Sequence, residues 1–514
     1  MTLDAATEQK TLTKSLLGFF SGTLLSRLSG FFRDVSMAFF FGADASIAAF
    51  LVALRFAILL RRLFGEGALL NGFIPHFETY RANNPKEAAK FFRDTFFTLL
   101  IILIAIIGMI EIGLYFFSFR QPSEIVHLIL FILPGTLFVC LFGISSALLH
   151  CEKQFFITGF APVAYNAIWI LAVLGSQSLP TPRAAVCLSC TITIAFFMQW
   201  LMTFPKTFRF LQTHISCKEM VRFRFFSPSV RQMLSSLSLG VIGVTATQIN
   251  TALDAVLARS VSLEGPAYLN YAIHLEQLPL ALFGIGIASV LLPSLSRAVQ
   301  ANDLPLCSQL VEFAISRSLW ALLPCSGIIF VGGNAIVNLI YGRGHFGSTE
   351  LLHTAECLWG YGWGLVPSAL VLLLAPIFYA RKDYKTPMIC SLLSIGVNLG
   401  LNCVFVYGLH LGPASLAYST SIAAAVNVCI LVPYIDIGFS NLLRRSILTT
   451  SLCTLFAMGV SSWVQRTWFQ ELERHFIGQF VHFLALFISF GGTFFLIAVW
   501  FKKKEIVAFL RKKR

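Results

Sequence analysis

Five arginines lie inside the first two apolar segments of the chain, a setting in which membrane spans rarely carry charge. Two acidic residues accompany them. The charged residues are Arg27, Arg33 and Asp34 in residues 15–41, and Arg55, Arg61, Arg62 and Glu66 in residues 47–66. Each arginine at the centre of a bilayer costs about 2.5–3.5 kcal/mol, so five facing lipid would cost about 15 kcal/mol. The side chains therefore face water, acidic partners or a ligand.

Pairing with the two acids is the first explanation of this arginine cluster. Arg27 and Asp34 are seven residues apart and share a helix face, and Glu66 follows Arg62 by four residues. These spacings predict the pairs Arg27–Asp34 and Arg62–Glu66, which act in gating or in structure. Three arginines then have no acid within these segments: Arg33, Arg55 and Arg61.

Anion binding is the second explanation. A guanidinium group stays charged and binds phosphate through two parallel hydrogen bonds. Arg61 and Arg62 have a further alternative, because they stand near the end of their segment and can extend to the cytoplasmic interface. The cluster predicts a transporter of a phosphate-bearing amphiphile, and structural pairing alone stays open beside it.

The composition identifies the elements that must position these residues. Of the 514 residues, 57% are hydrophobic and only 12% are charged, which is typical of a polytopic membrane protein. A span needs about 20 apolar residues. Fourteen segments meet that need: 15–41, 47–66, 92–117, 124–149, 159–178, 185–205, 233–258, 267–296, 311–333, 355–380, 387–408, 412–435, 446–464 and 478–501. We expect an all-α fold of fourteen transmembrane helices.

The distribution of basic residues predicts the orientation in the membrane. The two termini and alternate connections carry 27 of the 38 Lys and Arg residues, the opposite side carries six, and five are the arginines of the cluster. Such a bias places both termini in the cytoplasm. The basic C-terminal tail then anchors to the membrane surface, and we expect no nucleic-acid partner.

An internal repeat predicts two lobes. Setting Arg55 against His274 aligns the sequence LFGEG at 63–67 with LFGIG at 282–286. Six spans per copy give a parallel repeat, so we expect two six-helix lobes related by a pseudo-two-fold along the membrane normal, with a site between them. The predicted parts are a first lobe (1–210), a basic cytoplasmic linker (211–232), a second lobe (233–436), and a terminal helix pair with a basic tail (437–514).

Several motifs together resemble the MurJ/MviN family, the lipid II flippases of the multidrug/oligosaccharidyl-lipid/polysaccharide (MOP) exporter superfamily. They are SRLSGFFRDVSMAFFFGA, LLRRLFGEGALLNGFIP, FAPVAYN, LLPSLS, YGRGHF and FYARKDYKTP, and they extend over almost the whole chain. The resemblance implies a flippase rather than an enzyme, located in the bacterial cytoplasmic (inner) membrane. It implies lipid II, the undecaprenyl-diphosphate-linked disaccharide-pentapeptide, as substrate, membrane lipids and other cell-wall synthesis and division proteins as partners, and a terminal pair that receives the polyprenyl tail.

The resemblance also implies which residues bind the substrate. The central arginines of the family match Arg27, Arg33 and Arg61, and a basic residue early in the second span matches Arg55. In the second lobe the family has an arginine where this chain has His274 in YAIHL, so His274 is expected either to grip the diphosphate or to be part of the cavity wall.

A second polar set lies in the second lobe. It comprises Asp254, Asn398, Asn402 and Thr420. Oxygen ligands on facing helices suit a sodium ion, the one cofactor we consider, and some members of the family bind sodium at matching positions. Asn402 stands where those members have a carboxylate, so hydrogen bonding between helices is an equal alternative.

Other functions fit less well. A drug exporter needs an acidic or aromatic cavity for cations, whereas this cluster is basic, and another polysaccharide-lipid flippase is the nearest alternative. A polyprenyl-phosphate glycosyltransferase needs an acidic cluster near one interface, and a channel needs a filter; the sequence has neither. It also has no G-x-x-x-x-G-K-[ST] loop, so ATP hydrolysis is excluded as the drive. Membrane potential, sodium and protons stay open as driving forces.

Overall fold

The chain folds into helices, as its apolar segments predict. The computed structural model describes residues 2–64, 68–301, 303–381, 383–435, 441–469 and 475–512, and no strand occurs within these ranges. The all-α prediction is confirmed. The chain forms two compact units, Met1–Val256 and Leu257–Arg514.

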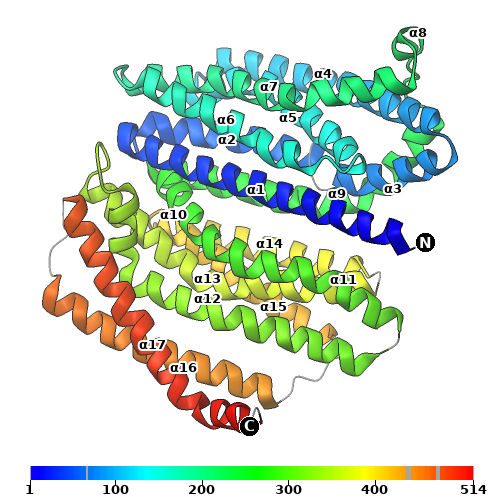
Figure 1. The fold of residues 1–514 in the computed structure, drawn as a ribbon. Helices are drawn as coiled ribbons and strands as arrows, with labels where there is room; N and C mark the ends of the chain where they lie inside the picture. Colours follow the sequence, from blue (N-terminus) through cyan, green and yellow to red (C-terminus); the bar gives the residue numbers. More distant parts are fainter. Residues whose placement is uncertain are drawn as a thin grey trace. The chain divides into compact units, whose positions relative to one another are not determined.

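The first unit is a bundle of long helices that run side by side (Figure 1). Its helices are α1 (Thr2–Phe41), α2 (Ala45–Phe64), α3 (Ala68–Asn83), α4 (Pro85–Arg120), α5 (Glu124–Cys151), α6 (Phe155–Ser176), α7 (Thr181–His214), the short α8 (Cys217–Val221) and most of α9 (Pro228–Val261).

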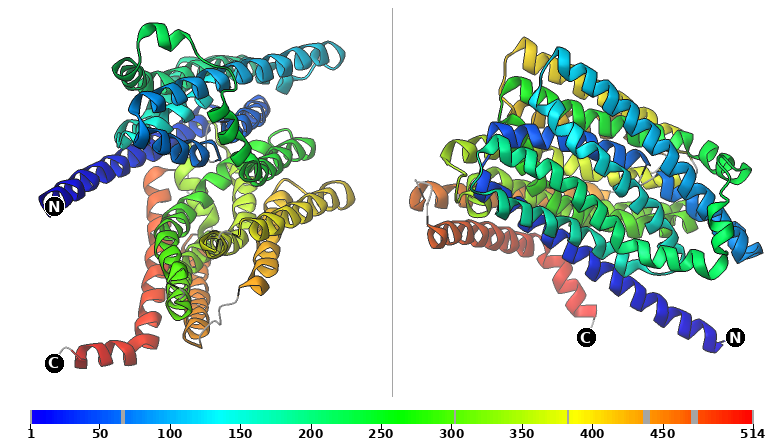
Figure 2. Two further views of the ribbon diagram at one scale, coloured as in Figure 1. Left: turned by 90° about the vertical axis from the view of Figure 1, so that its right-hand side faces the viewer. Right: turned by 90° about the horizontal axis from the view of Figure 1, so that it is seen from above.

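The second unit is also a helical bundle, seen from two further directions in Figure 2. After the end of α9 it contains α10 (Gly265–Pro279), the π-helical η1 (Leu280–Ile285), α11 (Gly286–Gln300), α12 (Leu304–Tyr341), α13 (Ser348–Ala380), α14 (Lys385–Cys403), the π-helical η2 (Val404–Gly408), α15 (Ala414–Leu431), the 3-10 turn η3 (Val432–Tyr434), α16 (Asn441–Trp468) and α17 (Phe476–Lys512). The terminal pair, α16 and α17, packs on α12.

The boundary between the units lies inside α9, after the basic linker that the sequence suggests. The predicted lobe limits depend on the repeat and stay a prediction. The predicted axis between the lobes also stays a prediction.

The helices are long and apolar enough for a multi-pass membrane protein. Eleven helical segments of the described chain meet this criterion. All fourteen predicted ranges overlap helices, but α1, α2 and α9 are not among the eleven. In α2 the reason is plain, because three arginines fall within its 20 residues. The count of fourteen spans therefore stays a prediction.

The two units repeat the same internal packing. In the first unit α2 packs on α5, α4 on α5, α5 on α7, and α6 on α7. In the second unit the corresponding pairs in chain order are α10 with α13, α12 with α13, α13 with α15, and α14 with α15. Two units with one pattern of pairs support the duplication that the aligned motifs suggest.

The glycine motif of the second unit lies at a change of helix type. In the first unit the last three residues of LFGEG, 65–67, lie outside the described residues, between α2 and α3. In the second unit α10 passes through the π-helical η1 into α11, and LFGIG covers this change. Pro279 precedes η1 and has no backbone N–H to donate, which favours a local change of helix type there.

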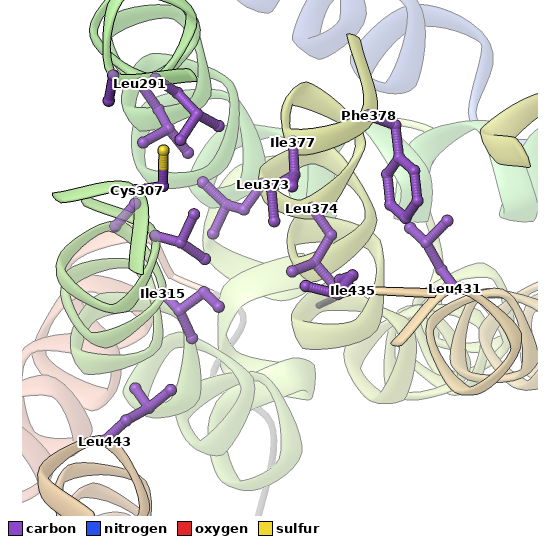
Figure 3. Packing of buried hydrophobic residues seen from close by; sticks show 14 of the residues in the cluster. Leu291, Cys307, Ile315, Leu373, Leu374, Ile377, Phe378, Leu431, Ile435 and Leu443 are labelled. Carbon is purple, nitrogen blue, oxygen red and sulfur yellow. The ribbon is translucent and has the colours of Figure 1, made fainter. Parts of the chain in front are cut away.

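Corresponding apolar cores stabilise the two units. In the first, Phe73 and Phe77 of α3 pack with Phe91 and Phe92 of α4 and with parts of α5, α7 and α9. In the second, Leu291 of α11 belongs to a cluster with α12, α13, η3 and α16, drawn in Figure 3. Each core joins the short helix after the glycine motif to the bundle.

Candidate substrate-binding site

Close packing of α1 against α6 sets the geometry around the first arginines. A Cβ added at Gly22 of α1 would lie 2.9 Å from the backbone oxygen of Phe156, so only glycine allows this approach. Further along, the Asn166 side chain of α6 donates from Nδ2 to the Ser29 hydroxyl at 2.9 Å and to the Ser26 carbonyl at 3.2 Å. These bonds orient the Asn166 amide, whose Oδ1 faces Arg33.

Arg33 is held on three sides at this helix contact. Its Nε and Nη2 donate to Oδ1 of Asp34 at 2.9 and 2.7 Å, and its Nη1 donates to Oδ1 of Asn166 at 3.1 Å. The guanidinium also lies over the indole of Trp169, 4.5 Å from the ring centroid. The Arg33 and Asp34 side chains are only 16% and 14% exposed. A guanidinium held in this way keeps a fixed direction, which is what bidentate recognition of an anion requires.

The predicted pair Arg27–Asp34 is wrong, because Asp34 bonds to its sequence neighbour Arg33. The sequence predicts the pair because Arg27 and Asp34 share a helix face. The flexible Arg33 side chain reaches Asp34 instead, because a second helix fixes the Arg33 guanidinium. Asn166 and Trp169 of α6 supply that fixation. The acid therefore orients Arg33 and partly offsets its charge.

Arg61 shares the surroundings of Arg33. Tyr165 of α6 is buried and stacks on Phe196 of α7, with ring centroids 5.0 Å apart. Arg33, Arg61 and Asp34 all lie close enough to act electrostatically on the Tyr165 side chain. The first unit therefore brings two of the three arginines matched to the family's central positions around one buried tyrosine.

The other members of the arginine cluster differ in their exposure. Arg27 and Arg62 are exposed, and Arg55 is half-buried. Glu66 lies outside the described residues, so the predicted Arg62–Glu66 pair stays a prediction. The predicted placement of Arg27 and Arg55 beside Arg33 stays a prediction.

His274 lies in α10 of the second unit, where its side chain is half-buried. Asn270, one helical turn earlier, is buried. Whether His274 meets the same ligand as the arginines stays a prediction, because the two units are described separately.

The polar set considered for sodium forms a hydrogen-bonded network between α14 and α15. The Asn402 amide donates to Oδ1 of Asn398 at 2.8 Å, and the Asn398 amide donates to the Thr420 hydroxyl at 3.2 Å. The Ser419 hydroxyl donates to Oδ1 of Asn402. This geometry favours the alternative of hydrogen bonding between helices for these three predicted residues.

Asp254, the fourth member of the predicted sodium set, belongs to the first compact unit, whereas the asparagines belong to the second. Its Oδ2 accepts a 3.4 Å hydrogen bond from Asn250 in the same helix. The predicted sodium site therefore stays a prediction.

Asn166, Trp169 and Glu276 are not among the site residues that the sequence predicts. Asn166 belongs to the FAPVAYN motif, and it and Trp169 fix the direction of Arg33. Glu276 is a buried carboxyl in the middle of an apolar span. A polar side chain within an apolar helix is the signal that would have identified Asn166 and Glu276.

The comparison with protein families decides what kind of membrane protein this is. The family model described as lipid II flippase MurJ matches residues 37–483. The chain belongs to this family. A "probable lipid II flippase MurJ" from Chlamydia pneumoniae is 33% identical over 478 residues, covering 89% of this chain and 85% of that protein. The corresponding protein from Chlamydia trachomatis is 34% identical over 422 residues, covering 81% and 77%.

Solved structures show the same fold. A structure of "Lipid II flippase MurJ, inward closed conformation" matches with a TM-score of 0.78 at 24% identity, over 95% of this chain and 99% of that one. An inward-facing multidrug resistance MATE transporter of the MOP superfamily matches with a TM-score of 0.63 at 13% identity, over 85% and 99%. The MurJ family shares its fold with exporters of other substrates, so fold alone does not select the cargo.

The MurJ family assignment confirms the class expected from the sequence. Members are named as flippases, which are transporters and not enzymes. Together with the apolar helices, it identifies the chain as a multi-pass protein of the bacterial inner membrane.

Proposed function

We propose that this chain moves lipid II from the inner to the outer leaflet of the cytoplasmic membrane by alternating access. In this proposal the diphosphate binds to the guanidinium groups of Arg27, Arg33, Arg55 and Arg61. His274 provides a further contact. Membership of the MurJ family supports the cargo.

The fixed orientation of Arg33 is the observation that carries the anion-binding part of the proposal. Asp34, Asn166 and Trp169 hold the guanidinium at the contact of α1 and α6. An arginine that only neutralised Asp34 would not need the additional bond to Asn166 and the stacking on Trp169. In our proposal Asp34 limits the charge of the unloaded site, and the diphosphate competes for the guanidinium when it arrives.

Depletion of the protein tests the function directly. The assay measures the lipid II that is accessible on the outer leaflet of cells or spheroplasts. We expect depletion to abolish its appearance there while total lipid II accumulates. Unchanged exposure after complete depletion, in a strain without a second flippase, would refute the proposal.

Substitution of the arginines tests the site. Arg33→Ala and Arg61→Ala should fail to restore growth while the protein still inserts into the membrane. Arg183→Ala is the matched control, since Arg183 is exposed at the start of α7 and has no part in the cluster. Normal growth with Arg27→Ala and Arg33→Ala would favour structural pairing alone.

A further inference from the structure

Glu276 is a carboxyl group buried at the midpoint of a membrane-spanning helix. It is the twelfth of the 24 residues in the apolar segment Gly265–Ala288. Only 6% of the residue is exposed. Ionisable residues at such a depth are rare and usually functional. The arginine-based site described above does not use it.

No partner neutralises Glu276 in the described structure. The resolved contacts include no hydrogen bond or ion pair to its carboxyl, and no other charged group acts on it. It also stands apart from His274, since two residues along a helix place their side chains on nearly opposite faces. Glu276 is therefore not an acid that orients the predicted diphosphate contact.

The helices around α10 bring few titratable groups. α10 packs on α13, α12 and η1, and η1 contributes none. Of their titratable groups, His353 of α13 and Tyr341 of α12 lie against Tyr268 and Tyr271 of α10, and Glu350 and Cys357 of α13 lie within electrostatic reach of Tyr268. None of these exerts an electrostatic effect on the Glu276 carboxyl. A change in its charge would consequently have no nearby compensation.

Buried polar atoms occur at about the same level of the bundle. The rings of Tyr268 in α10 and His353 in α13 lie 5.3 Å apart, and a Cβ at Gly284 would lie 3.6 Å from the Cβ of Ala369. Glu276 lies midway between Tyr268 and Gly284 along the chain, and Tyr361 lies midway between His353 and Ala369. The two residues are therefore at the same level of the bundle.

Trp359 is two residues from Tyr361, and its indole N–H is buried with no hydrogen-bond partner among the described residues. The same holds for the side-chain oxygen of Asn334 in α12. A Cβ at Gly333, the residue before Asn334, would lie 2.5 Å from the indole nitrogen, so the Trp359 side chain points toward α12. Polar atoms of this kind commonly bind internal water.

The surroundings of Glu276 favour the neutral acid. A charged carboxylate at the centre of a span costs about 2.5–3.5 kcal/mol on insertion scales, and more without a partner. The neutral acid avoids most of this cost. The carboxyl therefore holds a proton while it is buried as it is here, and releases it in any conformation that opens it to water.

We propose that Glu276 is a proton-binding site that couples inward proton movement to the outward movement of the lipid cargo. The inference rests on the proposed flippase function and adds its driving force. In the step itself the carboxylate takes one proton to become the carboxylic acid and later returns it, and no other bond changes. Because the proton binds the conformation that buries Glu276 better than the one that exposes it, a proton gradient biases the exchange between them.

Infrared spectroscopy of the purified protein tests the proton site without any transport assay. We expect a carbonyl stretching band of a protonated carboxylic acid that persists when the bulk pH is raised well above the usual carboxyl range. Glu276→Gln should remove this band. Glu356→Gln should leave it unchanged, since Glu356 is an exposed carboxyl of α13. A parent spectrum without a persistent band overturns the proposal, whether or not the variant folds.

Transport in proteoliposomes tests the coupling. Parent protein should flip lipid II faster when the side that receives the cargo is more acidic, by up to about tenfold per pH unit, because one pH unit is a tenfold change in proton activity. Glu276→Gln should flip at one rate whatever the gradient, and Glu356→Gln should behave like the parent. A gradient response retained by Glu276→Gln overturns the coupling. If the parent flips no lipid II, the proposed function fails, while the infrared result still reports on the proton site.

Discussion

The guanidinium of Arg33 lies over the indole ring of Trp169, 4.5 Å from its centroid, and this contact joins α1 to α6. The Trp169 ring packs edge-on against Tyr165, with centroids 5.6 Å apart. Tyr165 is in turn within electrostatic reach of Arg61. One aromatic pair thus contacts Arg33 of α1 and lies within electrostatic reach of Arg61 of α2.

Substitutions of Arg33 should separate charge from geometry. Arg33→Ala should abolish complementation, whereas Arg33→Lys should restore it only partly, because an ammonium group is a point charge that cannot bond Asp34 and Asn166 as the planar guanidinium does. Trp169→Leu should weaken lipid II binding several-fold, since a cation–π contact contributes about 0.5–2 kcal/mol. Growth complementation measures the first effect, and titration of purified Trp169→Leu with lipid II measures the second. Full activity of Arg33→Lys would mean that charge alone suffices.

His274 should act as the second unit's contact with the diphosphate. We expect His274→Arg to remain active, because the MurJ/MviN pattern has arginine at this position, and His274→Gln to be impaired. Lipid II exposure on the outer leaflet is the measurement. Gln277→Ala is the control, since Gln277 is exposed three residues further along α10. Flipping by His274→Gln at the parental rate would show that the residue is only part of the wall.

The repeat and the helices were predictable from the sequence, because each depends on a pattern that is local or recurs. Apolar runs define the helices, and the aligned LFGEG and LFGIG motifs agree with the same pattern of helix pairs in both units. The pairing of Asp34 was not predictable. Neighbours on a helix do not normally face each other, and Asn166 and Trp169, more than 130 residues away, help to direct Arg33 toward it. Contacts of that kind depend on how α6 packs.

Reporter fusions should confirm the orientation that the basic residues predict. Fusions after residue 231 and at residue 514 should both read cytoplasmic, because 27 of the 38 Lys and Arg residues fall on that side. A fusion after residue 180, between α6 and α7, should read periplasmic and serves as the control. If the fusions at 231 and 514 lie on opposite sides of the membrane, the span count and the repeat are wrong.

The network between α14 and α15 should stabilise the second unit. Asn402→Ala removes the partner of Ser419 and of Asn398, and interhelical hydrogen bonds in membranes contribute about 0.6 kcal/mol on average and up to about 1.7 kcal/mol. We expect a lower melting temperature in detergent, with Cys403→Ala as an exposed neighbour that leaves it unchanged. Repeating the melts with sodium and with choline separates the alternatives. Stabilisation by sodium in the parent but not in Asn402→Ala would favour the metal site.

The ion pair that joins α8 to α4 should depend on pH, because it uses the Glu219 carboxylate. A 2.8 Å ion pair joins the Lys86 ammonium to the Glu219 carboxylate, and Ser216 caps α8 through the same acid. The hydrogen bond from Lys86, followed by that from the Ser216 backbone N–H, lowers the pKa of Glu219 from 4.5 to about 2. Because the pKa of Glu219 is depressed in the folded chain, the stabilisation from this ion pair is fully present above about pH 4.5. It is lost as the pH falls toward 2.

Hydrogen exchange of the α8 amides, corrected for the intrinsic pH dependence of exchange, measures this loss. Protection should fall across the pH window of Glu219 in the parent and should be low throughout in Glu219→Gln. Glu87→Gln is the control, because Glu87 forms an exposed ion pair with Lys90 in the same helix as Lys86. Protection of α8 that stays constant between pH 5 and pH 2, or that is equal in Glu219→Gln and the parent, would mean that other contacts hold this connection instead. Such contacts are the Arg93 guanidinium on the Glu219 backbone oxygen and the stacking of Phe223 on Phe97.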